Sequence, residues 1–251
     1  MYSLNKGLFV YLFAGKLAEV DHWYFLTFLA FMLISMAAAY LLGSINSAII
    51  VSKVLYRDDI RKHGSGNAGM TNMLRTYGAK AALLTLLGDL MKTALSVFIA
   101  AVFFGFNYVG GISTGDGFCY MAGLFAVIGH VFPIYYGFKG GKGVLATAVT
   151  ALILSPIPFI ILFSLFALIV AFSKYVSLAS VSAAVLYPVV LHGYFAVVFP
   201  GAGTPGIMSL STIIIAILIV WCHRENLKRI SNRTENKISF GKKNKKNEDD
   251  E

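Results

Sequence analysis

The chain has 251 residues, of which 57% are hydrophobic and only 13% are charged, whereas soluble domains carry roughly 25% charged residues. Its 21 Lys and Arg side chains outnumber 12 Asp and Glu, which gives a formal net charge of +9. This composition excludes an ordinary soluble protein and indicates an integral membrane protein, whose positive charge suits anionic lipid headgroups and phosphorylated ligands. We expect no nucleic-acid partner, because few polar elements remain to read a groove.

The N-terminal segment 1–22 holds one short apolar patch, at 7–14, between Lys6 and Lys16. A membrane span needs about 20 apolar residues, so this patch is too short to cross a bilayer. We expect an interfacial extension, with a signal peptide as the alternative.

Seven later stretches are apolar enough to predict membrane helices. The first, 24–43, is followed by an apolar segment at 44–56 that either continues the helix or bends at Gly43 and Ser44. Pro156 and Pro158 predict a turn between two short stretches. The six other stretches cover 81–105, 118–138, 144–154, 159–172, 175–199 and 207–222.

The span 81–105 contains two charged residues, Asp89 and Lys92, which are three positions apart and therefore share one helix face. A charge near the middle of a bilayer costs at least about 2.5 kcal/mol, so both side chains should face the protein interior. An internal ion pair and a role in a site both fit this pattern.

The distribution of positive charge predicts the orientation of the chain. With the N-terminus outside, the segments 57–80, 139–143, 173–174 and 223–251 lie in the cytoplasm and hold 17 of the 21 Lys and Arg. The opposite turns, at 106–117, 155–158 and 200–206, hold none. We therefore predict an all-α polytopic protein of the cell membrane with about seven transmembrane helices, an outside N-terminus and a cytoplasmic C-terminus. Its membrane domain covers 23–238, followed by a charged disordered tail at 239–251.

The polar loop 57–80 contains the segment 64–75, which is built from glycines, hydroxyls, side-chain amides and one arginine. Glycines let backbone N–H groups approach a ligand and form a nest for an anion. Arg75 can bind a phosphate through two N–H groups. Read alone, the segment also fits a flexible, solvated turn.

Two further polar stretches fall on the same predicted side of the membrane. The segment 130–133, His-Val-Phe-Pro, precedes a basic glycine loop at 138–143, which leads into the helix expected from Val144 and its free N–H groups. The third stretch, 223–227, continues with Thr-Glu-Asn-Lys at 234–237. Together the three stretches supply cations, hydroxyls, amides and small residues, which suits phosphate groups.

Several other kinds of site are excluded by spacing. The glycine loop lacks the Gly-x-x-x-x-Gly-Lys-Ser/Thr pattern of a P-loop and follows a membrane helix rather than a strand. There is no Gly-x-Ser-x-Gly elbow, no His followed five residues later by Asp, and no cluster of metal ligands, so we expect no metal and no other cofactor. Cys119 and Cys222 lie in apolar surroundings and are expected to fill the core.

The histidines differ in their surroundings. His22 and His192 are not surrounded by a polar cluster and are expected to be interfacial or packing residues. His130 fits packing and a site role equally. His223 is favoured as functional, because Arg224 and Asn226 adjoin it at the cytoplasmic end of a predicted span.

The three polar stretches resemble those of the bacterial acyl-phosphate:glycerol-3-phosphate acyltransferases, and the likeness covers roughly 24–240. The shared residues also include Gly-Ser-Ile at 43–45 and Tyr-Val-Ser-Leu at 175–178. Three positions depart from the usual family pattern. Asn46 stands where Pro is usual, Met70 where Ala is usual, and Arg233 where Gly is usual.

The resemblance implies transfer of a fatty acyl group from acyl phosphate to the 1-hydroxyl of glycerol 3-phosphate, which gives lysophosphatidic acid and phosphate. A mixed anhydride has a good leaving group, so no covalent acyl-enzyme is expected, and positioning with charge stabilisation suffices. Membrane lipids surround the protein, and the acyl chain should lie in a groove between the spans.

The resemblance also assigns roles to residues. Ser65, Arg75, His223 and Asn226 are expected to be catalytic, with His223 or the donor's own phosphate as the base. Glu235 is expected to be a structural brace that pairs with a local cation. The residues expected to bind substrate are Gly66, Asn67, Gly69, Asn72, Lys139, Gly140, Gly141, Lys142 and Gly143.

Two other classes of protein remain open from the residues alone. A transporter of a phosphorylated anion fits seven spans and basic loops, but it would place its polar groups near the membrane midplane rather than at one face. A non-catalytic lipid-binding scaffold is the second alternative.

Overall fold

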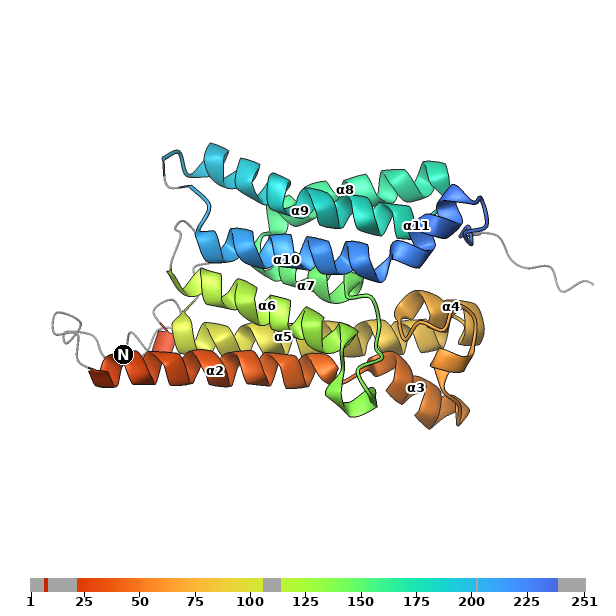
Figure 1. Ribbon diagram of the computed structural model, residues 1–251, viewed down its shortest axis with the longest axis horizontal. Coiled ribbons are helices and arrows are strands. Elements are labelled where there is room, and N and C mark those ends of the chain that lie inside the picture. The colour runs from red at the N-terminus through yellow and green to blue at the C-terminus, as the bar shows by residue number, and fades with distance from the viewer. Residues whose placement is uncertain (1–6, 9–21, 106–113, 202, 239–251) are drawn as a thin grey trace, which may run out of the picture.

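Figure 1 shows the computed structural model, which describes residues 7–8, 22–105, 114–201 and 203–238. These residues form helices, turns and loops, and they contain no strand. The all-helical fold expected from the sequence is therefore confirmed for the part that is described. The predicted extension up to His22 and the predicted tail at 239–251 lie essentially outside the described residues, so both stay predictions.

The helices follow the apolar stretches closely. Helix α7 has the predicted bounds, and α5, α8, α9 and α10 begin and end within three residues of the predicted ones. The helices are α2 (His22–Ser44), α3 (Ser47–Tyr56), η1 (Ile60–Lys62), α4 (Met70–Tyr77), α5 (Ala79–Phe104), α6 (Thr114–Val131), η2 (Ile134–Tyr136), α7 (Val144–Leu154), α8 (Pro156–Ser173), α9 (Val176–Val198), α10 (Gly206–Cys222) and α11 (Arg224–Ser231).

The first apolar region breaks in two, which settles the choice left open by the sequence. Helix α2 ends at Ser44, and α3 begins after Asn46, whose side-chain oxygen accepts a hydrogen bond from the Ile49 N–H at 3.0 Å. An asparagine oxygen in this position satisfies an N–H group that has no acceptor within the helix. Asn46 therefore starts a new helix at the position where the resembled family usually has proline.

Helix α6 ends seven residues before the predicted limit, at Val131. Pro133 has no N–H group and forces Phe132 towards extended backbone, so the α-helix stops before it. The short helix η2 follows instead. The glycine loop 139–143 therefore does not follow directly on the end of α6, and it packs back against this helix.

Two helices were not expected from the sequence. Helix α4 forms inside the polar loop 57–80 because Met73 is completely buried beside Ile49, Ile60 and Ala81. Helix α11 follows α10 at a bend of 54°. Both are only eight residues long, and both carry residues of the predicted site.

Five helical segments are long and apolar enough to cross a membrane, and α10 with α11 makes a sixth if this bent pair is counted as one span. Helix α7 has 11 residues and therefore measures about 16 Å, roughly half of the hydrocarbon thickness. The structure thus supports five or six spans by length and composition, against the seven predicted.

Helices α2, α5 and α6 pack against one another, α8 packs on α9, and α10 contacts both α6 and α9. Glycines bring α2 and α6 together: a Cβ atom on Gly43 would lie 2.3 Å from the Ala126 carbonyl, and one on Gly129 would lie 2.3 Å from the Tyr40 carbonyl. Small residues allow such close approach between membrane helices. Cys119 is buried in this core, as expected.

Asp89 and Lys92 form an ion pair inside the protein, one of the two alternatives that the sequence left open. Lys92 Nζ lies 2.9 Å from Asp89 Oδ1, and the two residues are 2% and 5% exposed. The prediction that both face the interior is confirmed.

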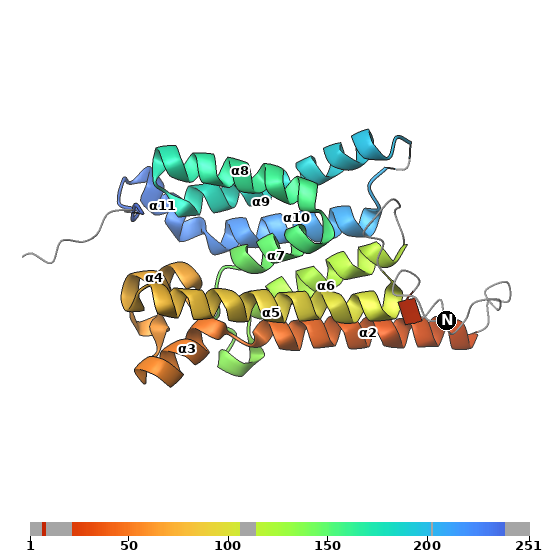
Figure 2. The same cartoon turned by 180° about the vertical axis from the view of Figure 1, so that it is seen from behind.

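The long helices run roughly along one direction, and the polar elements gather at one end of the bundle. Figures 1 and 2 show α3, α4 and α11 at this end, opposite the start of α2. The first and third polar stretches of the sequence therefore lie at the same end of the bundle.

Candidate active site

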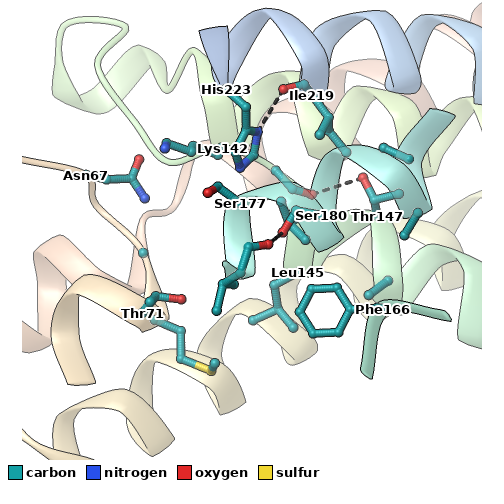
Figure 3. Close-up of a pocket in the computed structure, with 18 of the residues that line it drawn as sticks. Asn67, Thr71, Lys142, Leu145, Thr147, Phe166, Ser177, Ser180, Ile219 and His223 are labelled. Atoms are coloured by element: carbon teal, nitrogen blue, oxygen red, sulfur yellow. Dashed lines mark hydrogen bonds between the residues drawn. The ribbon is translucent and has the colours of Figure 1, made fainter. Parts of the chain in front are cut away.

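A cavity of about 440 Å³ lies between the polar end of the bundle and helices α7, α8 and α9. The four residues predicted to be catalytic, Ser65, Arg75, His223 and Asn226, all line it. Of the nine residues predicted to bind substrate, Asn67, Gly69, Asn72, Lys142 and Gly143 line it as well. Figure 3 shows Asn67, Lys142 and His223 around one part of this cavity, with Leu145 and Phe166 in another.

The first loop is held in shape by Asn72, which is 2% exposed. Its amide nitrogen donates to the carbonyl oxygens of His63 at 2.9 Å and Asn67 at 3.0 Å, and its oxygen accepts from the Ser65 N–H at 3.0 Å. An asparagine amide has only two N–H donors, so none is left for an anion. Asn72 therefore fixes the loop that presents Ser65 and Asn67, and its own contact with substrate stays a prediction.

Arg75 lies in the last turn of α4, is exposed and lines the cavity. Gly69 precedes the first turn of the same helix. Gly66 is exposed with a φ of +70° and does not line the cavity. The first loop thus turns Ser65, Asn67 and Arg75 towards the cavity and leaves Gly66 outside it.

The second loop divides into two parts. Lys142 and Gly143 line the cavity, and Gly143, with a φ of +79°, precedes the first turn of α7. Gly140 and Gly141 lie behind them: their N–H groups donate to the carbonyl oxygens of Val131 and His130 at 3.2 and 3.0 Å. Lys139 is exposed and does not line the cavity.

Lys142 is bound to the third polar stretch, because its ammonium donates to Asn226 Oδ1. Burial lowers the pKa of Lys142, and the nearby Glu235 carboxylate opposes this shift. A lysine that is partly stripped of water beside a cavity is a strong point charge for an incoming phosphate.

Glu235 joins the third stretch to α9. It accepts hydrogen bonds from Asn226 Nδ2 at 2.7 Å, Arg229 Nε at 2.8 Å and Ser177 Oγ at 2.9 Å. Burial alone would raise the pKa of Glu235, but these three hydrogen bonds outweigh it and lower the pKa. The carboxylate therefore stays charged at neutral pH, and its partner cation is Arg229.

His223 stands at the junction of α10 and α11 and is 3% exposed. Its Nδ1 lies 2.8 Å from the Ile219 carbonyl oxygen, which can only accept, so Nδ1 carries the proton. Burial lowers the pKa of His223 to about 4. The ring is neutral at pH 7 and keeps an Nε2 lone pair that can accept a proton.

The remaining part of the cavity is apolar. It runs along α7 from Val144 to Ala151, eight residues or about 12 Å of helix. Helices α8 and α9 supply the facing walls. The apolar side chains that line it include Leu145, Ala148, Ala151, Phe159, Leu162, Phe163, Phe166, Ala183 and Ala184.

Sequence reasoning missed two hydroxyl residues of α9, Ser177 and Ser180, as well as Thr71 and Thr147, all of which line the cavity. The pair on α9 had a signal, since two serines three residues apart share one face of a helix beginning at the polar end. Arg61 was missed as a link between loops; its Nη1 donates to the Tyr136 carbonyl at 3.1 Å. In the described chain, no three His, Cys, Asp or Glu side chains are grouped to hold a metal ion.

Comparison with known proteins identifies the arrangement. A family model described as glycerol-3-phosphate acyltransferase matches residues 10–233. The chain is 40% identical over 206 residues to a glycerol-3-phosphate acyltransferase of Alkaliphilus metalliredigens, with 82% of this chain and 95% of that protein covered. The chain belongs to the glycerol-3-phosphate acyltransferase family. A second member, from Syntrophomonas wolfei, is 42% identical over 201 residues, with 80% and 93% covered.

Solved structures agree with this family of acyltransferases. The glycerol 3-phosphate form of PlsY, an integral membrane glycerol 3-phosphate acyltransferase, aligns with a TM-score of 0.70 at 32% identity and covers 83% of this chain and 96% of its own. Its lysophosphatidic acid form gives a TM-score of 0.68 at 31% identity, with 83% and 95% covered. The resemblance inferred from the three motifs is confirmed, and the protein is a membrane acyltransferase of phospholipid synthesis.

The acyltransferase accommodates its unusual Arg233 without losing the site. This residue has a φ of +58°, in the left-handed region that favours glycine. The Thr234 N–H still donates to the Arg229 carbonyl at 2.8 Å, and Glu235 reaches its three partners. Met70 lines the cavity.

Proposed function

We propose that this acyltransferase moves a fatty acyl group from acyl phosphate to the 1-hydroxyl of glycerol 3-phosphate. The observation that supports this most directly is the two-part cavity. Its cationic end, with Arg75 and Lys142, suits two phosphate groups, and its apolar end along α7 suits an acyl chain. Each methylene buried there contributes about 0.8 kcal/mol to binding of the donor.

The reaction is direct transfer. The glycerol 3-phosphate oxygen bonds to the acyl carbonyl carbon, the bond from that carbon to the phosphate oxygen breaks, and the hydroxyl proton goes to His223 Nε2 or to the departing phosphate. Among the described residues, the hydroxyl that is hydrogen-bonded to a histidine is that of Thr204, and this threonine and its partner His192 lie outside the cavity, so the pair is not placed to supply a nucleophile there. This supports transfer without an acyl-enzyme.

Residue roles follow from position. Ser65, Asn67 and Arg75 bind the donor phosphate and the charge that develops on it. Lys142, with the loop 140–143, binds glycerol 3-phosphate. His223 and Asn226 orient the reacting groups, and Glu235 braces Asn226 and Arg229.

The protein lies in the cell membrane with its active site on the cytoplasmic face. The charge distribution supports this, since 17 of 21 Lys and Arg fall in the segments assigned to that side. We place α7 as a seventh, short crossing and the domain at 23–238. The test is Lys62→Cys in a protein whose Cys119 and Cys222 are replaced by alanine. The new thiol should react with an impermeant thiol reagent only from the cytoplasmic side. Labelling from the outside would show that the chain has the opposite orientation.

The purified enzyme in detergent should form lysophosphatidic acid and phosphate from acyl phosphate and glycerol 3-phosphate, with no membrane gradient. Acyl-CoA is tested in parallel. Turnover with acyl-CoA but not with acyl phosphate would overturn the proposed acyl donor. An acyl-enzyme trapped by rapid quenching and detected by mass spectrometry would overturn direct transfer.

A further inference from the structure

Three ionisable side chains lie buried where α2, α5 and α6 meet. Asp89, Lys92 and His130 are 2%, 5% and 4% exposed. Lys92 Nζ lies 2.9 Å from Asp89 Oδ1 and 3.0 Å from His130 Nδ1. Buried charges persist when they are paired and hydrogen-bonded, so this cluster forms one fixed network.

The network fixes the tautomer of His130. A lysine ammonium has N–H donors and no acceptor, so the Nδ1 atom that faces Lys92 must accept. The proton of the neutral ring is then on Nε2. His130 is therefore the opposite tautomer to His223, whose proton is on Nδ1.

The other edge of the His130 ring packs against the glycine loop. A Cβ atom on Gly141 would lie 2.1 Å from His130 Nε2 and 2.9 Å from Cδ2. The Gly141 N–H donates to the His130 carbonyl at 3.0 Å. One residue therefore supports Gly141 by its backbone and by its ring.

The same network reaches the first loop. Ser47 Oγ donates to Asp89 Oδ1 at 2.9 Å, and the neighbouring Asn46 donates to the Ala68 carbonyl at 3.4 Å. That carbonyl would lie 2.8 Å from a Cβ atom on Gly141. The two loops of the site are thus in contact at Ala68 and Gly141.

We propose that His130 is a positioning residue for glycerol 3-phosphate binding, held in one orientation by the buried Lys92–Asp89 pair so that its ring sets the position of Gly141. This rests on the proposed assignment of the loop 140–143 to glycerol 3-phosphate. Asp89 and His130 also line the cavity. In this role His130 acts on glycerol 3-phosphate through the backbone of the glycine loop rather than through direct contact.

The test uses His130→Asn in the full-length enzyme. The asparagine oxygen takes the place of Nδ1, so Lys92 keeps an acceptor and the fold keeps its buried hydrogen bond. The shorter side chain no longer reaches Gly141. The dissociation constant for glycerol 3-phosphate, measured by calorimetry in detergent, should rise about tenfold or more, while kcat at saturation stays within about threefold and the apparent melting temperature is kept. His192→Asn, at an exposed histidine that is hydrogen-bonded to Thr204, is the matched control and should change none of these values.

A double-mutant cycle tests the link to the ion pair. Asp89→Asn/Lys92→Met removes both charges together and should weaken glycerol 3-phosphate binding as His130→Asn does. Combined with His130→Asn, it should add no further loss, because all three residues act through one contact. If the combined variant loses affinity by the product of the two separate fold-losses, the coupling between the ion pair and the histidine is overturned.

Other outcomes are equally decisive. An unchanged dissociation constant in His130→Asn overturns the proposal, and a fall in kcat at unchanged binding would make His130 a substrate-contacting residue instead. Direct binding does not depend on the acyl donor. If the wild-type enzyme binds glycerol 3-phosphate but shows no turnover with acyl phosphate, the proposed donor fails while the positioning role is still tested.

Discussion

Replacing Gly141 with alanine tests the glycine loop with a single methyl group. That methyl carbon would lie 2.1 Å from His130 Nε2 and 2.8 Å from the Ala68 carbonyl, whereas ordinary contact begins at 3.4 Å. The nearer separation must therefore grow by about 1.3 Å. His130 cannot simply turn away, because Lys92 holds its Nδ1 at 3.0 Å, and the second neighbour is backbone.

The loop must then move, and Lys142 moves with it. A misplacement of about 1 Å in a binding group can cost about 10²-fold in rate. We expect kcat/KM for glycerol 3-phosphate to fall by about this factor in Gly141→Ala. Most of the loss should appear as a higher KM for glycerol 3-phosphate, with the KM for acyl phosphate within about threefold of the wild type.

The assay measures release of phosphate by the purified variant over a range of both substrates. Gly193→Ala is the matched control, because a Cβ atom at this helical glycine meets nothing within 4 Å. A fall in kcat at unchanged KM for glycerol 3-phosphate would refute the assignment of this loop, and wild-type kinetics would refute the rigidity of the His130 contact.

Three further substitutions separate the other parts of the site. Arg75→Ala should lower kcat by about 10²-fold, which is the cost of losing one charge stabiliser. Lys80→Ala, outside the cavity, should leave kcat unchanged. Near-normal turnover in Arg75→Ala would show that Arg75 is not part of the site. The pKa of folded His223 is about 4, below its ordinary 6.5, so its contribution to stability is complete above pH 6.5 and is lost as the pH falls towards 4. In His223→Gln, the unfolding free energy should therefore fall by up to about 3 kcal/mol less over this window than in the wild type. The apparent melting temperature should decline less steeply with falling pH, and parallel curves for the two proteins would contradict the shift. Ala148→Phe should raise the KM for long-chain acyl phosphate more than for short-chain donors and leave the KM for glycerol 3-phosphate unchanged; equal effects on all donors would place the acyl chain elsewhere.

The long helices other than α6 were predictable because each follows a long apolar run with a clear boundary. Helix α7 matched residue for residue, since Gly143 precedes it and Pro156 follows Ser155 at its end. Helix α4 was not predictable in the same way. Its eight residues are mostly polar, and it depends on burial of Met73 against distant segments. A window of two turns carries too little periodicity to reveal that.

The candidate site shows the same division between composition and long-range contact. The sequence identified Lys142, His223 and Asn226 as charge-handling residues, and all three line one cavity. It did not reveal that Asn72 uses its amide on loop carbonyls, or that His130 supports Gly141. Such roles depend on which backbone groups lack partners in the folded chain, and a linear pattern does not contain this information.

The break after α2 has a consequence for the order of assembly. Lys92 Nζ donates to the carbonyl oxygens of Gly43 at 3.1 Å and Ile45 at 2.7 Å, which lie 49 and 47 residues earlier in the chain. At about 5–20 residues per second, a ribosome needs roughly 2–10 s to reach that lysine after the two carbonyls have been made. During this interval the two carbonyl oxygens have no lysine partner, and nothing from α5 fixes the break between α2 and α3. Once α5 has been made, Lys92 can bond both carbonyl oxygens, so the geometry of the break is fixed by the second span and not by the first.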